Sequence, residues 1–281
     1  MKNFASNMVC LIVIACAALI AQAGTVIQQE GGDPNTATDK RTVTLYIDSG
    51  KLRMEQQDGQ AKKFVAIFDD SRQVMWVIDG EHNTYMEMTA AQVNGMANQM
   101  NAMKQQMQAQ LEQMPPQQRK MMEDMMKQRM GAMGQNAPAT VTVNEKGSEK
   151  VGQFSTTKYE VLKNGDHTSD LWAASPDQVH LGASDIATFK ALAKFYEPLT
   201  RNAPKGSWSA TQMMDQIKGF PVKTVDYQDQ KPTFQWVVTK AEQKSIDGSL
   251  FTLPSGLTKQ EMPGPGAMGG GMGQGRMGRP Q

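Results

Sequence analysis

Residues 89–133, TAAQVNGMANQMNAMKQQMQAQLEQMPPQQRKMMEDMMKQRMGAM, divide the chain into two parts and decide its fold class. This segment contains eleven of the chain's 23 methionines, many glutamines and no aromatic residue. The flanking regions instead alternate apolar and polar residues over short runs that end at turn residues, which is typical of β-strands. The sequence therefore predicts a helical insert within a β-rich protein.

The first half of the segment has the spacing of an amphipathic helix. Thr89 followed by Gln92 has the form of an N-terminal capping box, in which the two side chains satisfy backbone groups of the first turn. Four methionines then recur on one helical face: Met96, Met100, Met103 and Met107. We expect a helix that begins after Thr89.

Two prolines separate this helix from a second one. Pro115 cannot donate a backbone hydrogen bond and ends the first helix, whereas Pro116 suits the first position of the next. A second methionine stripe follows: Met122, Met126, Met130 and Met133. Gly131 is a candidate stop signal. Residues 89–133 thus predict a helical hairpin with a methionine seam.

Three roles fit such a seam. The thioethers can fill irregular apolar surface, form an adaptable lid over a hydrophobic ligand, or bind Cu(I) or Ag(I) as soft ligands. Packing and lid are favoured over metal, because soft-metal sites usually add Cys or His and the segment contains neither. The candidate ligand-contacting residues of the insert are Met96, Met100, Met103, Met107, Met122, Met126 and Met130.

The N-terminus has the build of a secretory signal peptide. Lys2 precedes an apolar run over residues 8–20, and Ala21-Gln22-Ala23 offers small residues at the cleavage positions. We expect export to the periplasm, with residues 24–262 as one domain and residues 263–281 as a disordered, Gly- and Met-rich tail. A lipid-modified Cys16 is the less favoured alternative, because the chain stays apolar directly after it.

Composition excludes several classes of function. Removal of the signal peptide takes away both cysteines, which excludes disulfides and Cys-zinc sites. It also leaves 29 − 1 = 28 basic side chains against 28 acidic ones. The mature chain therefore has no basic field for binding nucleic acid.

The flanking regions predict an α+β fold. Five strands are expected before the insert, at residues 42–47, 52–56, 63–68, 74–78 and 84–88. Six are expected after it, at residues 139–143, 157–162, 168–173, 222–227, 233–241 and 250–253. An amphipathic helix capped by Ser184 ends before Pro204, and residues 209–217 form a shorter helix. This order suggests a strongly curved antiparallel sheet that clasps helices, with Leu45 and Ile47 on a face that lines a core or cavity.

Several short segments carry a family resemblance: residues 46–55 (YIDSGKLRME), 79–85 (DGEHNTY), 158–162 (KYEVL), 171–173 (LWA), 219–221 (GFP) and 251–256 (FTLPSG). Together they resemble an uncharacterised family of secreted bacterial proteins, domain of unknown function 4412, which is similar in fold to the lipoprotein carriers LolA and LolB. The resemblance implies a half-open β-barrel around helices, with an apolar cavity that holds acyl chains in the carriers. It also allows association with the outer membrane or with a lipoprotein.

The candidate catalytic groups do not converge in the sequence. His82, His167 and His180 lie far apart, and Arg53 with Glu55 fits a structural ion pair on one strand or separate cross-strand partners. We therefore expect no catalytic residue, metal site or cofactor. The sequence predicts a non-enzymatic periplasmic binding protein for a lipid-like or other hydrophobic ligand; the alternative is a methionine-rich protein that binds Cu(I) or Ag(I) or buffers redox stress.

The signal peptide gives the first testable prediction. Because Ala21 and Ala23 occupy the cleavage positions, the exported protein should begin at Gly24. N-terminal sequencing of periplasmic material checks this result. A mature chain that begins with a diacylated Cys16 would contradict it.

Overall fold

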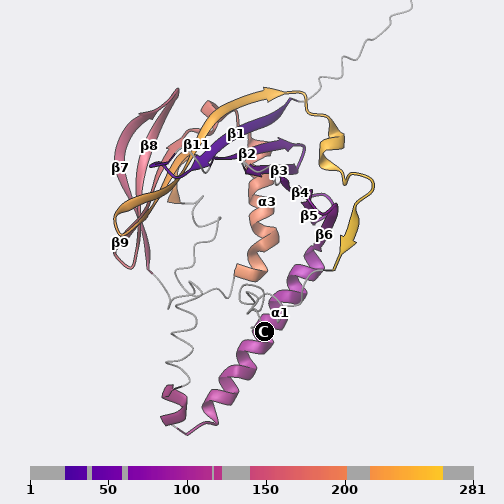
Figure 1. Ribbon diagram of the computed structural model, residues 1–281, viewed down its shortest axis with the longest axis vertical. Coiled ribbons are helices and arrows are strands. Elements are labelled where there is room, and N and C mark those ends of the chain that lie inside the picture. The colour runs from indigo at the N-terminus through magenta and orange to yellow at the C-terminus, as the bar shows by residue number, and fades with distance from the viewer. Residues whose placement is uncertain are drawn as a thin grey trace, which may run out of the picture.

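The structure is a computed structural model that describes residues 23–36, 40–58, 63–115, 117–121, 140–200 and 216–261. Within these residues, a 12-stranded sheet arches over helix α3 (Ala183–Thr200) (Figure 1). Its strand order is β12-β6-β5-β4-β3-β2-β1-β11-β10-β9-β8-β7. Among the described residues, the two edge strands, β12 and β7, do not pair with each other. The expected large, curved and unclosed sheet is therefore confirmed, and it is consistent with a half-open barrel.

The first half of the sheet is a meander followed by a helix. Its strands are β1 (Gly24–Gly32), β2 (Arg41–Asp48), β3 (Lys51–Asp58), β4 (Lys63–Asp69), β5 (Val74–Asp79) and β6 (Thr84–Thr89). Helix α1 (Ala90–Glu112) starts directly after β6. Thr89 and Gln92 form the expected capping box, and the helix ends before Pro115.

The second half contributes the remaining elements. Its strands are β7 (Val141–Val151), β8 (Phe154–Lys163), β9 (Asp166–Ala174), β10 (Phe220–Gln228), β11 (Lys231–Lys244) and β12 (Thr258–Gln260). Its helices are η1 (Pro176–Val179), α3 (Ala183–Thr200) and η2 (Gly248–Phe251). Adjacent strands are antiparallel except for β12, which pairs with β6 in parallel.

Strand β1 joins the two halves of the sheet. It pairs with β2 on one side and with β11 on the other, so that Gly24 lies opposite Lys244 and Gly32 opposite Gln235. The first strand of the sequence is thus an interior strand of the sheet. Among the described residues, no helix has the length and apolar character needed to cross a lipid bilayer.

The main core lies between α3 and the inner face of the sheet, which we define as the face toward α3. Ile27, Ile47 and Phe68 are fully buried there. Phe68 meets Phe195 of α3 edge to face at a centroid distance of 5.5 Å. Val93 brings the first turns of α1 into the same cluster.

The outer face of the first half is covered by the segment that contains η2. Phe251 packs against outward-facing residues of the meander, including Trp76 and Ile67. Arg53, which is buried, donates to the backbone carbonyl oxygen of Leu250 at 2.8 Å and forms an ion pair with Glu55 at 2.7 Å. The expected Arg53–Glu55 pair is therefore confirmed, and Arg53 holds the C-terminal segment against the sheet.

A buried polar contact fixes α3 against the sheet. The Thr25 hydroxyl lies 2.9 Å from a carboxylate oxygen of Asp185 and 2.9 Å from the carbonyl oxygen of His180. The same Asp185 oxygen accepts the backbone N–H of Gly182 at 2.9 Å. Both side chains are buried. The start of α3 is thus hydrogen-bonded to β1, in the middle of the sheet.

The structure corrects several sequence predictions. Residues 250–253 are not a strand, because the 3-10 helix η2 occupies Gly248–Phe251. Helix α3 begins at Ala183 rather than after Ser184, and it contains Pro198. The predicted strand over residues 139–143 extends to Val151. Strands β1 and β12 were not foreseen as separate strands.

Other predictions fall outside the described residues. They concern most of the signal peptide (residues 1–22 of 1–23), most of the second arm of the hairpin (residues 122–133), most of the short helix over residues 209–217, and the tail over residues 263–281. The first helix of the insert is confirmed, whereas the complete hairpin remains a prediction.

The contact between β1 and α3 yields a test of stability. Replacing Thr25 by Val keeps the shape but leaves the buried Asp185 carboxylate without the hydroxyl donor, so the free energy of unfolding should fall by about 1–3 kcal/mol. Urea denaturation measures the change. Thr42→Val, at an exposed position of β2, is the matched control and should change stability by less than about 0.5 kcal/mol. Equal effects of the two substitutions would contradict the assignment.

Candidate ligand site

A row of side chains on the inner face approaches the edge of the sheet formed by β6 and β12. Cross-strand partners share a face, and Val77 pairs with Met86, which in turn pairs with Gln260. One step along the strands, Phe64 pairs with Asp79 and Asp79 with Thr84. Val77 also packs against the main core. The inner face therefore continues from the core to this edge.

These rows enclose a pocket with a volume of about 410 Å³. Its lining comes from β4, β5, β6, β12 and the turn between β5 and β6: Phe64, Val77, Asp79, Glu81, His82, Thr84, Tyr85, Met86 and Gln260. Phe64 is 40% exposed, which is unusual for a large aromatic ring of a strand. The pocket has an apolar floor and a polar rim, a combination typical of sites for small molecules.

The rim is organised by Asp79 at the start of the β5–β6 turn. One carboxylate oxygen of Asp79 accepts the backbone N–H groups of Glu81 and His82, at 2.9 and 3.3 Å. The other oxygen lies 2.7 Å from Nδ1 of His82. The side-chain hydrogen bond from His82 is the main reason that the pKa of Asp79 lies below its usual value. Asp79 therefore closes the turn and carries a negative charge at neutral pH.

Leu45 and Ile47, the strand residues expected to line a cavity, lie in the core. Ile47 is fully buried, and Leu45 is partly buried against the same cluster. Neither residue lines the pocket. The alternation that placed them on one face was correct, but α3 covers that part of the face.

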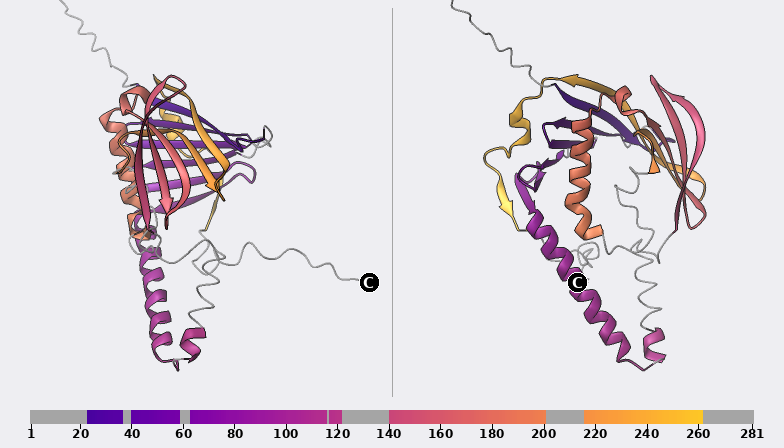
Figure 2. Two further views of the ribbon diagram at one scale, coloured as in Figure 1. Left: turned by 90° about the vertical axis from the view of Figure 1, so that its left-hand side faces the viewer. Right: turned by 180° about the vertical axis from the view of Figure 1, so that it is seen from behind.

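Two of the described methionines of α1, Met100 and Met103, face solvent. Met96 is partly buried, whereas Met100 and Met103 are 49% and 48% exposed. Among the described side chains of α1, those of Val93 and Ala97 are buried. Figure 2 shows that α1 leaves the end of β6 and projects beyond the sheet.

The structure does not test the roles predicted for the remaining methionines of the seam. The side chain of Met107 is not described, and Met122, Met126 and Met130 lie outside the described residues. In the part of the chain that the structure describes, His, Asp and Glu side chains form no group suited to a metal ion. The roles of the seam as lid or soft-metal site stay predictions.

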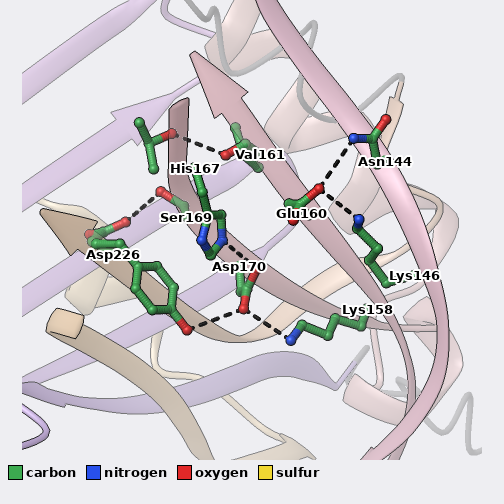
Figure 3. Close-up of polar contacts among 11 residues, drawn as sticks. Asn144, Lys146, Lys158, Glu160, Val161, His167, Ser169, Asp170 and Asp226 are labelled. Carbon is green, nitrogen blue, oxygen red and sulfur yellow. Dashed lines mark hydrogen bonds and ion pairs between the residues drawn. The ribbon is translucent and has the colours of Figure 1, made fainter. Parts of the chain in front are cut away.

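A polar cluster that was not foreseen lies on the outer face of β8, β9 and β10 (Figure 3). The carboxylate of Asp170 accepts hydrogen bonds from three side chains: Lys158 at 3.0 Å, His167 at 2.8 Å and Tyr227 at 3.2 Å. The rings of His167 and Tyr227 lie 4.4 Å apart. Asp170 itself is buried. We call these four residues the outer-face cluster.

Trp172 lies beside the cluster on the same face. The ammonium groups of Lys158 and Lys223 lie 4.8 and 4.6 Å from its ring centroid, one from each neighbouring strand. Its indole N–H donates to Glu149 of β7 at 2.8 Å. Together, the cluster and Trp172 tie strands β7 to β10 to one another.

The chemistry of the outer-face cluster is that of a satisfied ion network. Burial raises the pKa of Asp170, but the hydrogen bonds from Lys158 and His167 outweigh burial and hold the pKa below its usual value. Burial and the neighbouring Asp170 raise the pKa of Tyr227, so its hydroxyl stays protonated and donates. The arrangement stabilises the strands, because it links side chains of β8, β9 and β10.

Sequence analysis missed this cluster because of a β-bulge. His167 and Asp170 are three residues apart, a spacing that puts side chains on opposite faces of a regular strand. The register between β8 and β9 shifts between Val161 and Leu162, which leaves Thr168 as an extra residue. The bulge brings His167 to the face of Asp170, and no pattern in the sequence indicated it.

Comparison with known proteins identifies a family. The model of the family described as Domain of unknown function (DUF4412) matches residues 89–257. None of the curated proteins that were compared with the sequence matches it.

Several solved structures are distantly similar. An uncharacterized conserved protein from Thermus thermophilus is 8% identical with a TM-score of 0.44, over 86% of this chain and 92% of that chain. A structure of MucA/MucB from Pseudomonas aeruginosa gives 10% identity and a TM-score of 0.37, over 83% of this chain and 56% of that chain. PNGF-II gives 9% and 0.37, over 85% of this chain and 31% of that chain.

The outer-face cluster predicts a pH-dependent contribution to stability. Because the pKa of folded Asp170 is lowered, its contribution is present above the unfolded value of about 3.9 and is lost as the pH falls through the folded value. The difference in unfolding free energy between wild type and Asp170→Asn should therefore shrink from about pH 6 to about pH 3. Urea titrations at both pH values measure it. Asp166→Asn, at an exposed position of the same hairpin, is the control and should have little effect at either pH. A difference for Asp170→Asn that does not change with pH would contradict the assignment.

Proposed function

The chain belongs to the DUF4412 family, and we propose that it is a non-enzymatic periplasmic binding protein for a lipid-like or other hydrophobic ligand. One observation carries the proposal: the pocket of about 410 Å³ that opens on the inner face of the unclosed sheet. Export to the periplasm rests on the predicted signal peptide.

The size and lining of the pocket support a small apolar ligand group. Binding sites for small molecules usually have volumes of about 300–1,000 Å³ and a mainly apolar lining with a few polar groups. The volume of this pocket is near the lower end of that range. It suits one alkyl chain or one ring system, held against Phe64, Val77 and Met86.

The exposed ring of Phe64 supplies a driving force for ligand binding. A ligand that covers this ring removes apolar surface from water, and full burial of a Phe side chain is worth about 1.5–3 kcal/mol. The strand on the far side of the pocket is β12, which is three residues long and exposed. The ligand can therefore approach from the open edge of the sheet without unfolding the core.

The polar groups of the pocket fit a binding role. Asp79 and His82 are engaged with each other and with the turn, which accounts for their position without a chemical step. Thr84 and Gln260 add groups that can orient a polar part of the ligand. We infer binding and release rather than catalysis.

Two substitutions test the proposal. Met86→Trp should fill the pocket, and Phe64→Ala should remove its exposed ring, so each should weaken binding of a hydrophobic fluorescent dye about tenfold or more. Native mass spectrometry of the purified proteins should show less co-purifying ligand in both variants.

The control makes the same Met-to-Trp substitution outside the pocket. Met100→Trp, on the exposed part of α1, should leave dye binding unchanged. Circular dichroism establishes that each variant is folded. Unchanged dye affinity in both folded pocket variants would show that the pocket is not the ligand site.

A further inference from the structure

The segment that contains η2 and β12 is attached to the sheet at two places of unequal strength. The first attachment is at η2, where Phe251 is 3% exposed and belongs to the buried cluster of Trp76 and Ile67. Arg53 adds a hydrogen bond to the carbonyl oxygen of Leu250 at 2.8 Å. The segment is therefore firmly fixed at η2.

The second attachment is β12 (Thr258–Gln260), which runs beside β6 at the margin of the sheet (Figure 1, yellow). It has three residues, and all of them are exposed. Its pairing with β6 is parallel, which is slightly less stable per residue than antiparallel pairing. We therefore expect β12 to leave β6 at a much lower cost in free energy than η2 would leave the core.

An ion pair on the outer face holds β12 to β6. Nζ of Lys259 lies 2.7 Å from one carboxylate oxygen of Glu87, and the other oxygen accepts the indole N–H of Trp76 at 3.0 Å. Trp76 is buried, so the carboxylate is held in position. The Lys259 side chain is 51% exposed, and exposed ion pairs contribute little and weaken in salt. This contact can therefore open and close readily.

A joint lies between the two attachments. Gly256 has a φ of +85°, a left-handed conformation that glycine adopts without strain. Leu257, between this glycine and β12, is only partly buried. A few loop residues of this kind can absorb the dihedral changes of a hinge. The strand β12 can therefore swing while η2 stays in place.

The same strand forms one wall of the pocket. Gln260 lines the pocket and lies opposite Met86 of β6, which lines it too. Departure of β12 from β6 removes this wall and leaves Phe64, Val77 and Met86 on their own strands. The pocket can thus open without a change in the meander.

We propose that β12 is a detachable strap that controls the access of ligands to the pocket. The inference rests on the proposed function and concerns the regulation of the same site. With the strap paired to β6, Gln260 closes one side of the pocket; with the strap released, a ligand enters or leaves at the margin of the sheet. Water can satisfy the backbone groups of β6 that the strap leaves.

An engineered disulfide tests whether the strap has to move. Cys10 and Cys16 are the only cysteines of the chain, so a protein that begins at Gly24 has no competing thiol. Thr84 and Thr258 are directly paired, and neighbouring strands lie about 4.8 Å apart, within the range of Cα distances that a disulfide spans. The variant Thr84→Cys/Thr258→Cys therefore locks the strap when it is oxidised and frees it when it is reduced.

Stopped-flow fluorescence compares the two forms of this variant. The probe is N-phenylnaphthylamine, a neutral hydrophobic dye. Its rates of entry and release should both be at least about tenfold lower in the oxidised form, and both should recover on reduction. Circular dichroism establishes that the two forms are equally folded.

Loss of the ion pair should have the opposite effect. Lys259→Met keeps an apolar stem and removes the charge, so release of the dye should become about two- to fivefold faster. High salt should speed release from the wild type but not from this variant. Lys240→Met is the matched control, because Lys240 is 54% exposed and pairs with Glu242 at 2.7 Å on β11. It should leave the release rate unchanged.

Hydrogen exchange detects the motion of the strap without a ligand. The backbone amides of β6 that bond to β12 should exchange faster than the amides of β5, which has an antiparallel neighbour on each side. Lys259→Met should speed their exchange further. Exchange no faster than that of β5 would show that the strap does not detach.

The outcomes distinguish this inference from the proposed function. Dye binding with equal rates in the oxidised and reduced forms would overturn control by the strap and leave the pocket as the ligand site. An effect of Lys240→Met as large as that of Lys259→Met would overturn the role of the ion pair. No dye binding to the wild type or to either form of the double variant would overturn the proposed function, and control of access with it.

Discussion

The pairing of β1 with β11 is the constraint on which the rest of the structure depends. It brings Gly24–Gly32 against Lys231–Lys244, at opposite ends of the described chain, and converts two separate meanders into one sheet. The curvature that follows creates the inner face, and the Thr25–Asp185 contact places α3 on it. Without this pairing, the second half of the sheet would not help to cover the apolar side chains of the first half.

The position of α3 divides the inner face into a packed core and a pocket. Where α3 lies, the inner face is a packed core, and residues such as Ile47 have no contact with solvent. Beyond α3, toward β6 and β12, the same face becomes a pocket. On the outer face, Arg53 holds the C-terminal segment against the first half of the sheet, and the outer-face cluster stabilises strands β8 to β10. The site is therefore built on strands at the border of the core.

Sequence patterns predicted the regular elements well. Ten of the eleven predicted strands correspond to observed strands, because alternation and hairpin turns are local signals. The capping box at Thr89 was also correct. The pocket was not predicted, because it depends on which part of the face α3 leaves uncovered. The bulge at Thr168 and the parallel strand β12 depend on long-range pairing and left no local signal.

An unclosed sheet gives a ligand access, but it also leaves two edges with unpaired backbone groups, which are templates for aggregation. The chain protects the two edges differently. On β7, the register shifts between Glu145 and Gly147, and exposed charged residues follow along the strand. On β6, the short strand β12 occupies the edge, and Lys259 adds an ion pair to Glu87. The last described residues thus protect the protein from edge-to-edge association while forming one wall of its pocket.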